Sequence, residues 1–172
     1  MTGAGAGAGS FAVQLAKAFG AHVTAVCGPS SVDTVRAIGA DRAIDYTRED
    51  FTRERGVIDL LVDCAGRAPI GAMRKVLRPL GRCVVVGAPH RRVIGPIPRL
   101  LQVVVRRLLP GPRPVFFIAK MNAADLDTLA GLAVAGKMAP VIGRVVTLAN
   151  AGEAVAHILD GHARGKAVVT LR

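Results

Sequence analysis

The chain has very few aromatic side chains. Its 172 residues include no tryptophan, one tyrosine and five phenylalanines, so aromatic residues make up 3% of the sequence. Proteins that bind single-stranded nucleic acids stack the bases on aromatic side chains. The formal net charge of +11 favours anionic partners, but the shortage of aromatic residues argues against nucleic acid as one of them.

Metal-ligand motifs and long apolar segments are also missing. The three cysteines, Cys27, Cys64 and Cys83, lie in or beside apolar runs without a Cys-x-x-Cys pair, and the four histidines share no ligand spacing with them. We therefore expect no zinc in this chain. No apolar run approaches the roughly 20 residues of a membrane span, and no charged, apolar leader opens the sequence. We expect no membrane partner and a cytoplasmic location.

The segments that are present alternate between helical and strand patterns. The strands have continuous apolar runs, which indicate a parallel sheet with helices on its faces, an α/β fold. We expect strands at 21–27, 43–46, 57–63, 82–86, 115–120 and 167–171, a further strand soon after 138, and helices at 11–19, 31–38, 69–77, 122–135 and 151–160. Asn122 is the expected cap of its helix, and Gly136 the expected stop.

One segment, residues 90–114, interrupts this rhythm with six arginines and five prolines around a helix near 99–109. A basic helix of this kind fits a membrane surface. It also fits an ordinary surface helix with a solvated basic edge beside a binding cleft. We favour the second interpretation, because arginine is abundant throughout the chain and a genome of high G+C content would produce that abundance.

A glycine-rich stretch precedes the first helix. Gly3, Gly5, Gly7 and Gly9 alternate with Ala4, Ala6 and Ala8. Where a strand turns into a helix, glycines let the backbone approach a ligand, and the helix amino terminus offers N–H groups to a pyrophosphate. A low-complexity leader would look similar over nine residues. The helices and strands that follow at suitable lengths favour the nucleotide interpretation.

The stretch also fits the Thr-Gly-x-x-x-Gly-x-Gly pattern of short-chain dehydrogenases. Those enzymes need a Tyr-x-x-x-Lys pair, in which the lysine lowers the pKa of the tyrosine for proton transfer. Tyr46 is the only tyrosine, and Asp50 stands four residues after it. Short-chain chemistry is therefore excluded.

A better match is the medium-chain dehydrogenase/reductase superfamily, in its quinone-reductase-like branch, often called zinc-binding dehydrogenases. The chain resembles it in the segments "GSFAVQLAKAFGAHVTAVC", "VRAIGADRAIDYTREDF", "DLLVDCAG", "LRPLGRCVVVGAP" and "EAVAHILDGHARGKAVVTL". The resemblance implies a Rossmann-type doubly wound parallel sheet lacking its first strand. It also implies an NADP-binding domain over 1–137, truncated at its amino terminus, and a remnant of the catalytic domain over 138–172.

Family members are about twice this length, so the chain looks like the carboxy-terminal half of a larger enzyme. An internal start codon or a truncated gene would explain a Met1 at the end of the first Rossmann strand. The family loop Gly-Ala-Ser-Gly-Gly-Val-Gly-Ser falls on Gly3 to Ser10, and this chain departs from it at Gly5, Ala6 and Ala8. The Cβ of Ala8 is expected near the pyrophosphate.

The cofactor expected from the resemblance is NADP(H), with NAD(H) as the alternative. At the end of the second Rossmann strand NAD-binding proteins carry an acidic residue for the ribose, whereas this chain has Val26, Cys27 and Gly28. Many relatives carry arginine or lysine at the position of Ser30 to hold the 2′-phosphate, and this chain does not. The expected cofactor-binding residues are Gly3, Gly5, Ala6, Gly7, Ala8, Gly9, Ser30, Tyr46, Cys64, Gly87 and Ala88.

Two of these assignments have structural alternatives. Tyr46 falls where relatives place a tyrosine beside the adenosine phosphate, but it also fits a partly buried aromatic residue at a strand end. Cys64, Gly87 and Ala88 follow strands at the edge where the nicotinamide would lie, and each also fits plain packing. Asp63 could act as a general base, yet an acid that ends a buried strand more often accepts backbone hydrogen bonds.

The implied function is hydride transfer from NADPH to a quinone, an enone or a carbonyl compound. In the family the substrate contacts come largely from the amino-terminal domain, so we name no catalytic residue and expect no catalysis by this chain alone. The alternatives are a non-catalytic nucleotide-binding or interaction module and a truncated gene product without function. The resemblance also implies a homodimer through the strand Val115–Lys120.

Overall fold

The computed structural model describes residues 1–86, 97–108, 110–116, 120, 122–159 and 164–171. The chain divides into two compact units, each made of two segments of the sequence. Unit 1 consists of Met1–Gly3 and Tyr46–Met121, and unit 2 consists of Ala4–Asp45 and Asn122–Arg172.

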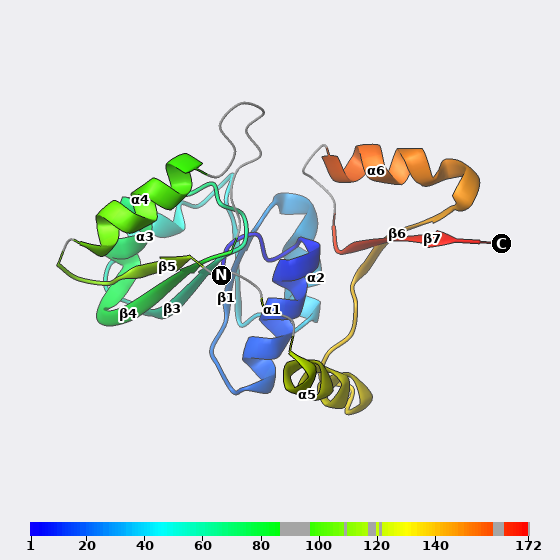
Figure 1. Cartoon of the computed structure of the whole chain (residues 1–172), viewed down its shortest axis with the longest axis horizontal. Coiled ribbons are helices and arrows are strands. Elements are labelled where there is room, and N and C mark those ends of the chain that lie inside the picture. Colours follow the sequence, from blue (N-terminus) through cyan, green and yellow to red (C-terminus); the bar gives the residue numbers. More distant parts are fainter. Residues whose placement is uncertain (87–96, 109, 117–119, 121, 160–163, 172) are drawn as a thin grey trace. The chain divides into compact units, whose positions relative to one another are not determined.

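Unit 1 is a three-stranded parallel sheet with two helices. Its strand order is β3-β4-β5, and α3 and α4 lie together beside the sheet (Figure 1). In chain order its elements are η2 (Phe51–Arg53), β3 (Ile58–Asp63), α3 (Ile70–Val76), β4 (Leu77–Val85), α4 (Ile97–Arg107) and β5 (Pro114–Phe116).

The core of unit 1 lies between these helices and the sheet. α3 contributes its buried face, α4 contributes Val103, and the strands contribute alternate side chains. The buried cluster consists of Leu61, Ile70, Met73, Val76, Leu77, Cys83, Val85 and Val103. Burial of these apolar groups is the main stabilising contribution to the unit.

The strand β4 begins earlier than the sequence pattern predicts. Arg82–Val86 was the expected range, but the strand starts at Leu77, directly after α3. Ile58 pairs with Leu77 and Leu60 pairs with Arg82, so the register shifts between these pairs. The shift accommodates the extra residues of β4, which include Pro79 and Gly81. Proline and glycine are uncommon inside strands and often mark such irregularities.

The outer strand of the unit 1 sheet is β5, which pairs in parallel with β4. It covers the beginning of the predicted strand Val115–Lys120, and residues 117–119 lie outside the described part of the chain. The expected dimer through this strand stays a prediction.

Unit 2 contains two separate pairs of parallel strands, β1-β2 and β6-β7. Figure 1 shows α6 running along the β6-β7 pair. The elements of unit 2 are α1 (Gly7–Ala18), β1 (Thr24–Cys27), η1 (Pro29–Ser31), α2 (Val32–Ala37), β2 (Arg42–Asp45), α5 (Ala123–Val134), β6 (Ile142–Thr147), η3 (Leu148–Asn150), α6 (Ala151–Leu159) and β7 (Lys166–Thr170).

These elements confirm the predicted parallel α/β class. The cap of α5 is also confirmed, because the Asn122 side chain accepts a hydrogen bond from the Ala124 N–H at 2.9 Å, and Gly136 has the positive φ of 68° typical of a helix stop. Within the described chain no strand precedes α1. Thr2 instead forms an isolated parallel bridge with Asp63 at the end of β3. The division at residue 137 stays a prediction.

Candidate functional site

The glycine-rich loop ends at the amino terminus of α1, and this terminus lacks a side-chain cap. The N-cap residue is Ala6, whose methyl group cannot accept a hydrogen bond, and the first turn contains no acidic residue. The first helical bond runs from the Ser10 N–H to the Ala6 carbonyl at 2.9 Å. The N–H groups of Gly7, Ala8 and Gly9 therefore have no acceptor within the helix, and they are available to an anion.

Close packing explains why the loop needs glycine at position 5. A Cβ on Gly5 would lie 2.5 Å from both Cβ and Oγ of Ser31, a separation that real side chains do not adopt. Next to it, the Ala4 N–H donates to the Val26 carbonyl at 3.2 Å, which ties the loop to β1. The loop is thus held against the end of β1 by backbone contact.

The tail of the chain also binds the loop. The Gly165 N–H donates to the Gly5 carbonyl at 2.9 Å, and Ala6 forms an isolated parallel bridge with Gly165. This contact brings the two basic residues on either side of Gly165, Arg164 and Lys166, to the loop.

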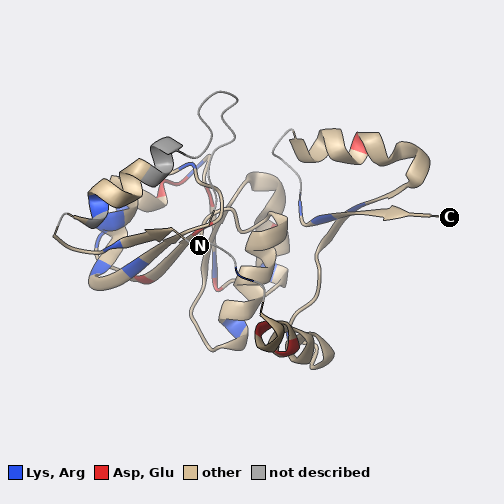
Figure 2. Ribbon diagram, in the orientation of Figure 1, with Lys and Arg blue, Asp and Glu red and all other residues tan. Residues whose placement is uncertain are grey.

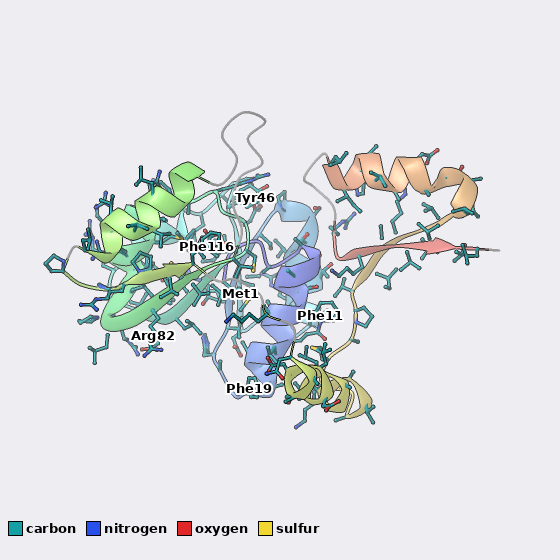
Figure 3. All side chains as sticks on the ribbon, viewed as in Figure 1. Met1, Phe11, Phe19, Tyr46, Arg82 and Phe116 are labelled. Carbon is teal, nitrogen blue, oxygen red and sulfur yellow. The ribbon has the colours of Figure 1, made fainter. Side chains whose placement is uncertain are left out.

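Lys166 lies across the start of α1. Its Nζ is 2.9 Å from the position that a Cβ on Gly7 would occupy, so a side chain there would displace the end of the lysine. The same Nζ lies 5.8 Å from the ring centroid of Phe11, a residue of α1 that Figure 3 labels. An ammonium group thus stands beside the uncapped helix terminus.

Arg164 lies beside Ser30. Its Nη1 donates to the Ser30 carbonyl at 3.0 Å, and its side chain is exposed. The position of Ser30 is the one at which relatives were expected to carry a basic residue for the 2′-phosphate. The tail therefore brings a guanidinium group to the place where the local sequence has a serine.

Sequence reasoning missed both basic residues, because 134 positions separate Arg164 from Ser30. The segment that contains both residues, "EAVAHILDGHARGKAVVTL", was used only as part of the family resemblance. Its one local signal was the pair of cations around a glycine, which is too common to identify a site. Of the predicted cofactor-binding residues, six lie in unit 2: Gly5, Ala6, Gly7, Ala8, Gly9 and Ser30. Their role in binding a cofactor stays a prediction.

The remaining predicted residues that are described lie in unit 1. Gly3 has a φ of +66°, and a Cβ there would lie 3.0 Å from the Ala65 nitrogen. Cys64 donates its N–H to the Thr2 carbonyl at 3.2 Å, so Gly3 and Cys64 lie close together. Burial, followed by the nearby Asp63 carboxylate, raises the pKa of the Cys64 thiol.

Asp63 has the structural role that the sequence favoured. It is completely buried, and its Oδ1 accepts hydrogen bonds from the Thr2 hydroxyl at 2.5 Å and from the Gly66 N–H at 3.0 Å. These bonds fasten the first residues of the chain to the end of β3. A carboxylate held in this way is suited to positioning the backbone of Thr2 and Gly66.

Tyr46 is half-exposed (labelled in Figure 3), and it lines an open depression together with the segment after it. The lining residues are Tyr46, Thr47, Arg48, Glu49, Asp50, Arg53 and Glu54. Gly87 and Ala88 lie outside the described residues, so their predicted contact with the nicotinamide stays a prediction.

The geometry of the loop fits the diphosphate of a dinucleotide. Three N–H groups lie beside the Lys166 ammonium group, and the first turn of α1 has no acidic residue. The Arg164 guanidinium group lies at Ser30, after the end of β1. Ala6 and Ala8 are exposed, so their methyl groups lie on the accessible side of the loop. The Cβ of Ala8 is therefore still expected near a bound diphosphate.

Among the described residues, no group of three or more His, Cys, Asp or Glu side chains is arranged to hold a metal ion. In the same part of the chain, none of the helices has both the length and the apolar character needed to cross a bilayer.

Comparison with known proteins identifies the family. A family model described as "Zinc-binding dehydrogenase" matches residues 38–169. The chain is 32% identical to a quinone oxidoreductase, QR1, from chloroplasts of Triphysaria versicolor, over 98% of this chain and 51% of that protein. It is 35% identical to the mitochondrial NAD(P)H oxidoreductase RTN4IP1 of Mus musculus, over 98% of this chain and 46% of that protein.

A solved structure of a quinone oxidoreductase has a similar fold. The quinone oxidoreductase from Coxiella burnetii superimposes with a TM-score of 0.80 at 26% identity, covering 99% of this chain and 51% of that one. This similarity confirms the predicted Rossmann-type fold. The chain spans about half the length of the curated relatives that it matches. On these grounds the chain belongs to the zinc-binding dehydrogenase family.

Proposed function

We propose that this chain is the NADP(H)-binding part of an oxidoreductase that reduces a quinone, an enone or a carbonyl compound. The observation that carries the proposal is the uncapped amino terminus of α1, with Lys166 lying against Gly7. A dinucleotide bound there would supply the hydride, while the chain binds and orients it. The N–H groups of Gly7, Ala8 and Gly9 would hold the diphosphate together with the Lys166 ammonium group.

Arg164 supports NADP(H) over NAD(H) as the cofactor. Its guanidinium group lies at Ser30, just after the end of β1, where the adenosine ribose of a Rossmann cofactor is bound. No acidic residue stands at Val26, Cys27 or Gly28 to repel a 2′-phosphate. Arginine binds phosphate groups through charge-assisted hydrogen bonds. The proposed role of Arg164 is therefore to select the phosphorylated cofactor.

For the other predicted cofactor residues the proposal depends on the family resemblance alone. It implies that Tyr46 contacts the adenosine phosphate and that Cys64, Gly87 and Ala88 lie near the nicotinamide. Substrate contacts would come from a domain like the amino-terminal half of the relatives. We therefore propose cofactor binding, but no turnover, for this chain alone. The cytoplasmic location also stays a proposal, since the plant and mouse relatives are described as chloroplastic and mitochondrial.

Calorimetric titration of the purified chain with NADPH and with NADH tests this proposal. We expect saturable NADPH binding, and we expect Arg164→Gln to weaken it by about 10- to 150-fold, because a hydrogen bond to a charged group contributes about 1.5–3 kcal/mol. The same variant should leave NADH binding unchanged. Lys166→Gln should weaken both, and Lys137→Gln, which removes an exposed cation after α5, should change neither.

The outcomes test the cofactor preference, the loop site and turnover separately. If both nucleotides bind equally and Arg164→Gln has no effect, the NADP(H) preference is contradicted. Such a result would still agree with a dinucleotide site at the loop. Binding of neither nucleotide would contradict the whole proposal and favour a gene product without function. NADPH oxidation in the presence of a quinone would show that this chain is catalytic by itself. Binding without turnover agrees with the proposal, and it is also what the alternative of a non-catalytic module predicts.

A further inference from the structure

The positive charge of this protein is concentrated in one segment. Residues 64–121 contain 12 Lys+Arg and no Asp or Glu, whereas the remaining residues carry 11 Lys+Arg and all 12 Asp+Glu. The whole segment belongs to unit 1. A genome bias toward arginine does not explain it, because such a bias would not exclude acidic residues from one contiguous segment. We call residues 64–121 the basic segment.

Figure 2 shows this concentration on the ribbon, with Lys and Arg, and no Asp or Glu, on α3, β4 and α4. Lys75, Arg82, Arg106 and Arg113 are exposed. One cation of the segment, Arg78, is paired with Asp59 of β3 at 2.8 Å. The exposed cations point to an anionic partner.

The helix α4, in the middle of the basic segment, has an apolar outer face. Val103 is 4% exposed and packs in the core of unit 1. Leu101, Val104, Val105 and Leu108 are 62%, 51%, 48% and 81% exposed. These four residues have the spacing i, i+3, i+4 and i+7, so they form one stripe along the helix and the turn that follows it. A surface helix normally carries polar residues in such a stripe.

Basic side chains lie next to the carboxy-terminal end of this stripe. The guanidinium group of Arg106 lies beside α3, with Nη2 3.4 Å from the position of a Cβ on Gly71. Arg74 of α3 reaches the turn after α4, where its Nε donates to the Pro112 carbonyl at 2.8 Å and its Nη2 to the Pro110 carbonyl. Cations from two helices thus lie at one end of the exposed apolar stripe.

We propose that the α4 stripe docks on an anionic lipid surface. The four apolar side chains would enter the boundary between headgroups and acyl chains, and the Arg106 guanidinium group near the end of the stripe would face the anionic headgroups. The helix has 11 residues, a length of about 16 Å, so it lies on the surface rather than crossing it. A second copy of the chain would bring the same positive charge to the contact, so charge complementarity favours the lipid. This inference does not depend on cofactor binding.

The chain has no tryptophan, so a single introduced indole reports its own environment. Leu108→Trp places it on the stripe. Val134→Trp, at the exposed end of α5 in unit 2, is the matched control. With vesicles of phosphatidylcholine containing about 30% phosphatidylserine, we expect the emission of Leu108→Trp to shift to the blue and that of Val134→Trp to stay unchanged. Pure phosphatidylcholine should shift neither, and added salt should reverse the effect.

Co-sedimentation of the full chain with the same vesicles gives a second measurement. Leu101→Gln with Val105→Gln should lower partitioning by about tenfold or more, because two apolar side chains leave the interface. Leu126→Gln with Val134→Gln, which removes two exposed apolar residues from α5, should not. Arg106→Gln should lower partitioning about fivefold. Circular dichroism establishes that each variant is folded.

Three results would overturn the proposal. The first is equal binding to charged and uncharged vesicles, which would indicate unspecific adsorption. The second is a blue shift of Leu108→Trp that grows with protein concentration in the absence of vesicles, which would assign the stripe to a second copy of the chain. The third is the absence of vesicle binding by the folded chain.

Discussion

Gly5→Ala tests the contact that holds the glycine loop against β1. The added Cβ would lie 2.5 Å from two atoms of Ser31, a residue that is itself only 6% exposed. Because neither side can move into solvent, the loop or η1 must shift. Overpacking of this kind costs about 1–3 kcal/mol of unfolding free energy. For a chain of this size each kcal/mol lowers the melting temperature by about 2–4 °C.

Differential scanning calorimetry of Gly5→Ala, Ser31→Gly and the double variant measures this cost as a double-mutant cycle. Ser31→Gly removes both clashing atoms, so we expect the double variant to recover most of the loss. Gly131→Ala, where an added Cβ meets nothing within 4 Å, is the control and should be neutral or slightly stabilising. If Gly5→Ala melts like this control, or if Ser31→Gly does not rescue it, the proposed contact is wrong.

Three further predictions concern the core, the pH dependence and the loop. Met73→Ala removes a fully buried side chain and should cost about 2–5 kcal/mol; urea unfolding with an unchanged midpoint would contradict the core described above. The Val23 N–H, followed by Lys17, lowers the pKa of Asp41 from 3.8 to about 2, so its stabilising contribution is present above pH 3.8 and is lost as the pH falls through about 2. Asp41→Asn should therefore melt below the wild type at pH 6, and this difference should disappear near pH 2. Ala8→Gly should lower the Kd for NADPH, because its methyl group lies on the accessible side of the loop; an unchanged Kd would show that the methyl group does not hinder the diphosphate.

The order of helices and strands could be predicted from the sequence, because local patterns determine it. Continuous apolar runs predicted β1, β3 and the end of β4, and the Asn122 cap and the Gly136 stop predicted the ends of α5. The early start of β4 could not be predicted. It depends on a shift in the register with β3, a contact between strands that no local pattern contains.

The candidate site could be predicted only in part. The glycines of the loop indicate a close backbone approach, and the structure gives the reason at Gly5, where a Cβ would clash with Ser31. The basic residues of the tail could not be found, because they reach the loop through a hydrogen bond between Gly165 and Gly5 that joins distant parts of the sequence. The exposed apolar face of α4 could not be predicted either. The sequence favoured an ordinary surface helix, and it does not show which apolar residues of this helix are buried.

The central claim is that the amino terminus of α1 binds the diphosphate of a dinucleotide. Nuclear magnetic resonance of the ¹⁵N-labelled chain during an NADPH titration tests it most directly. We predict that the amide signals of Gly7, Ala8 and Gly9 shift together and saturate at the same NADPH concentration. Saturable NADPH binding that leaves these three signals in place, or a titration in which no signal moves, would contradict the claim.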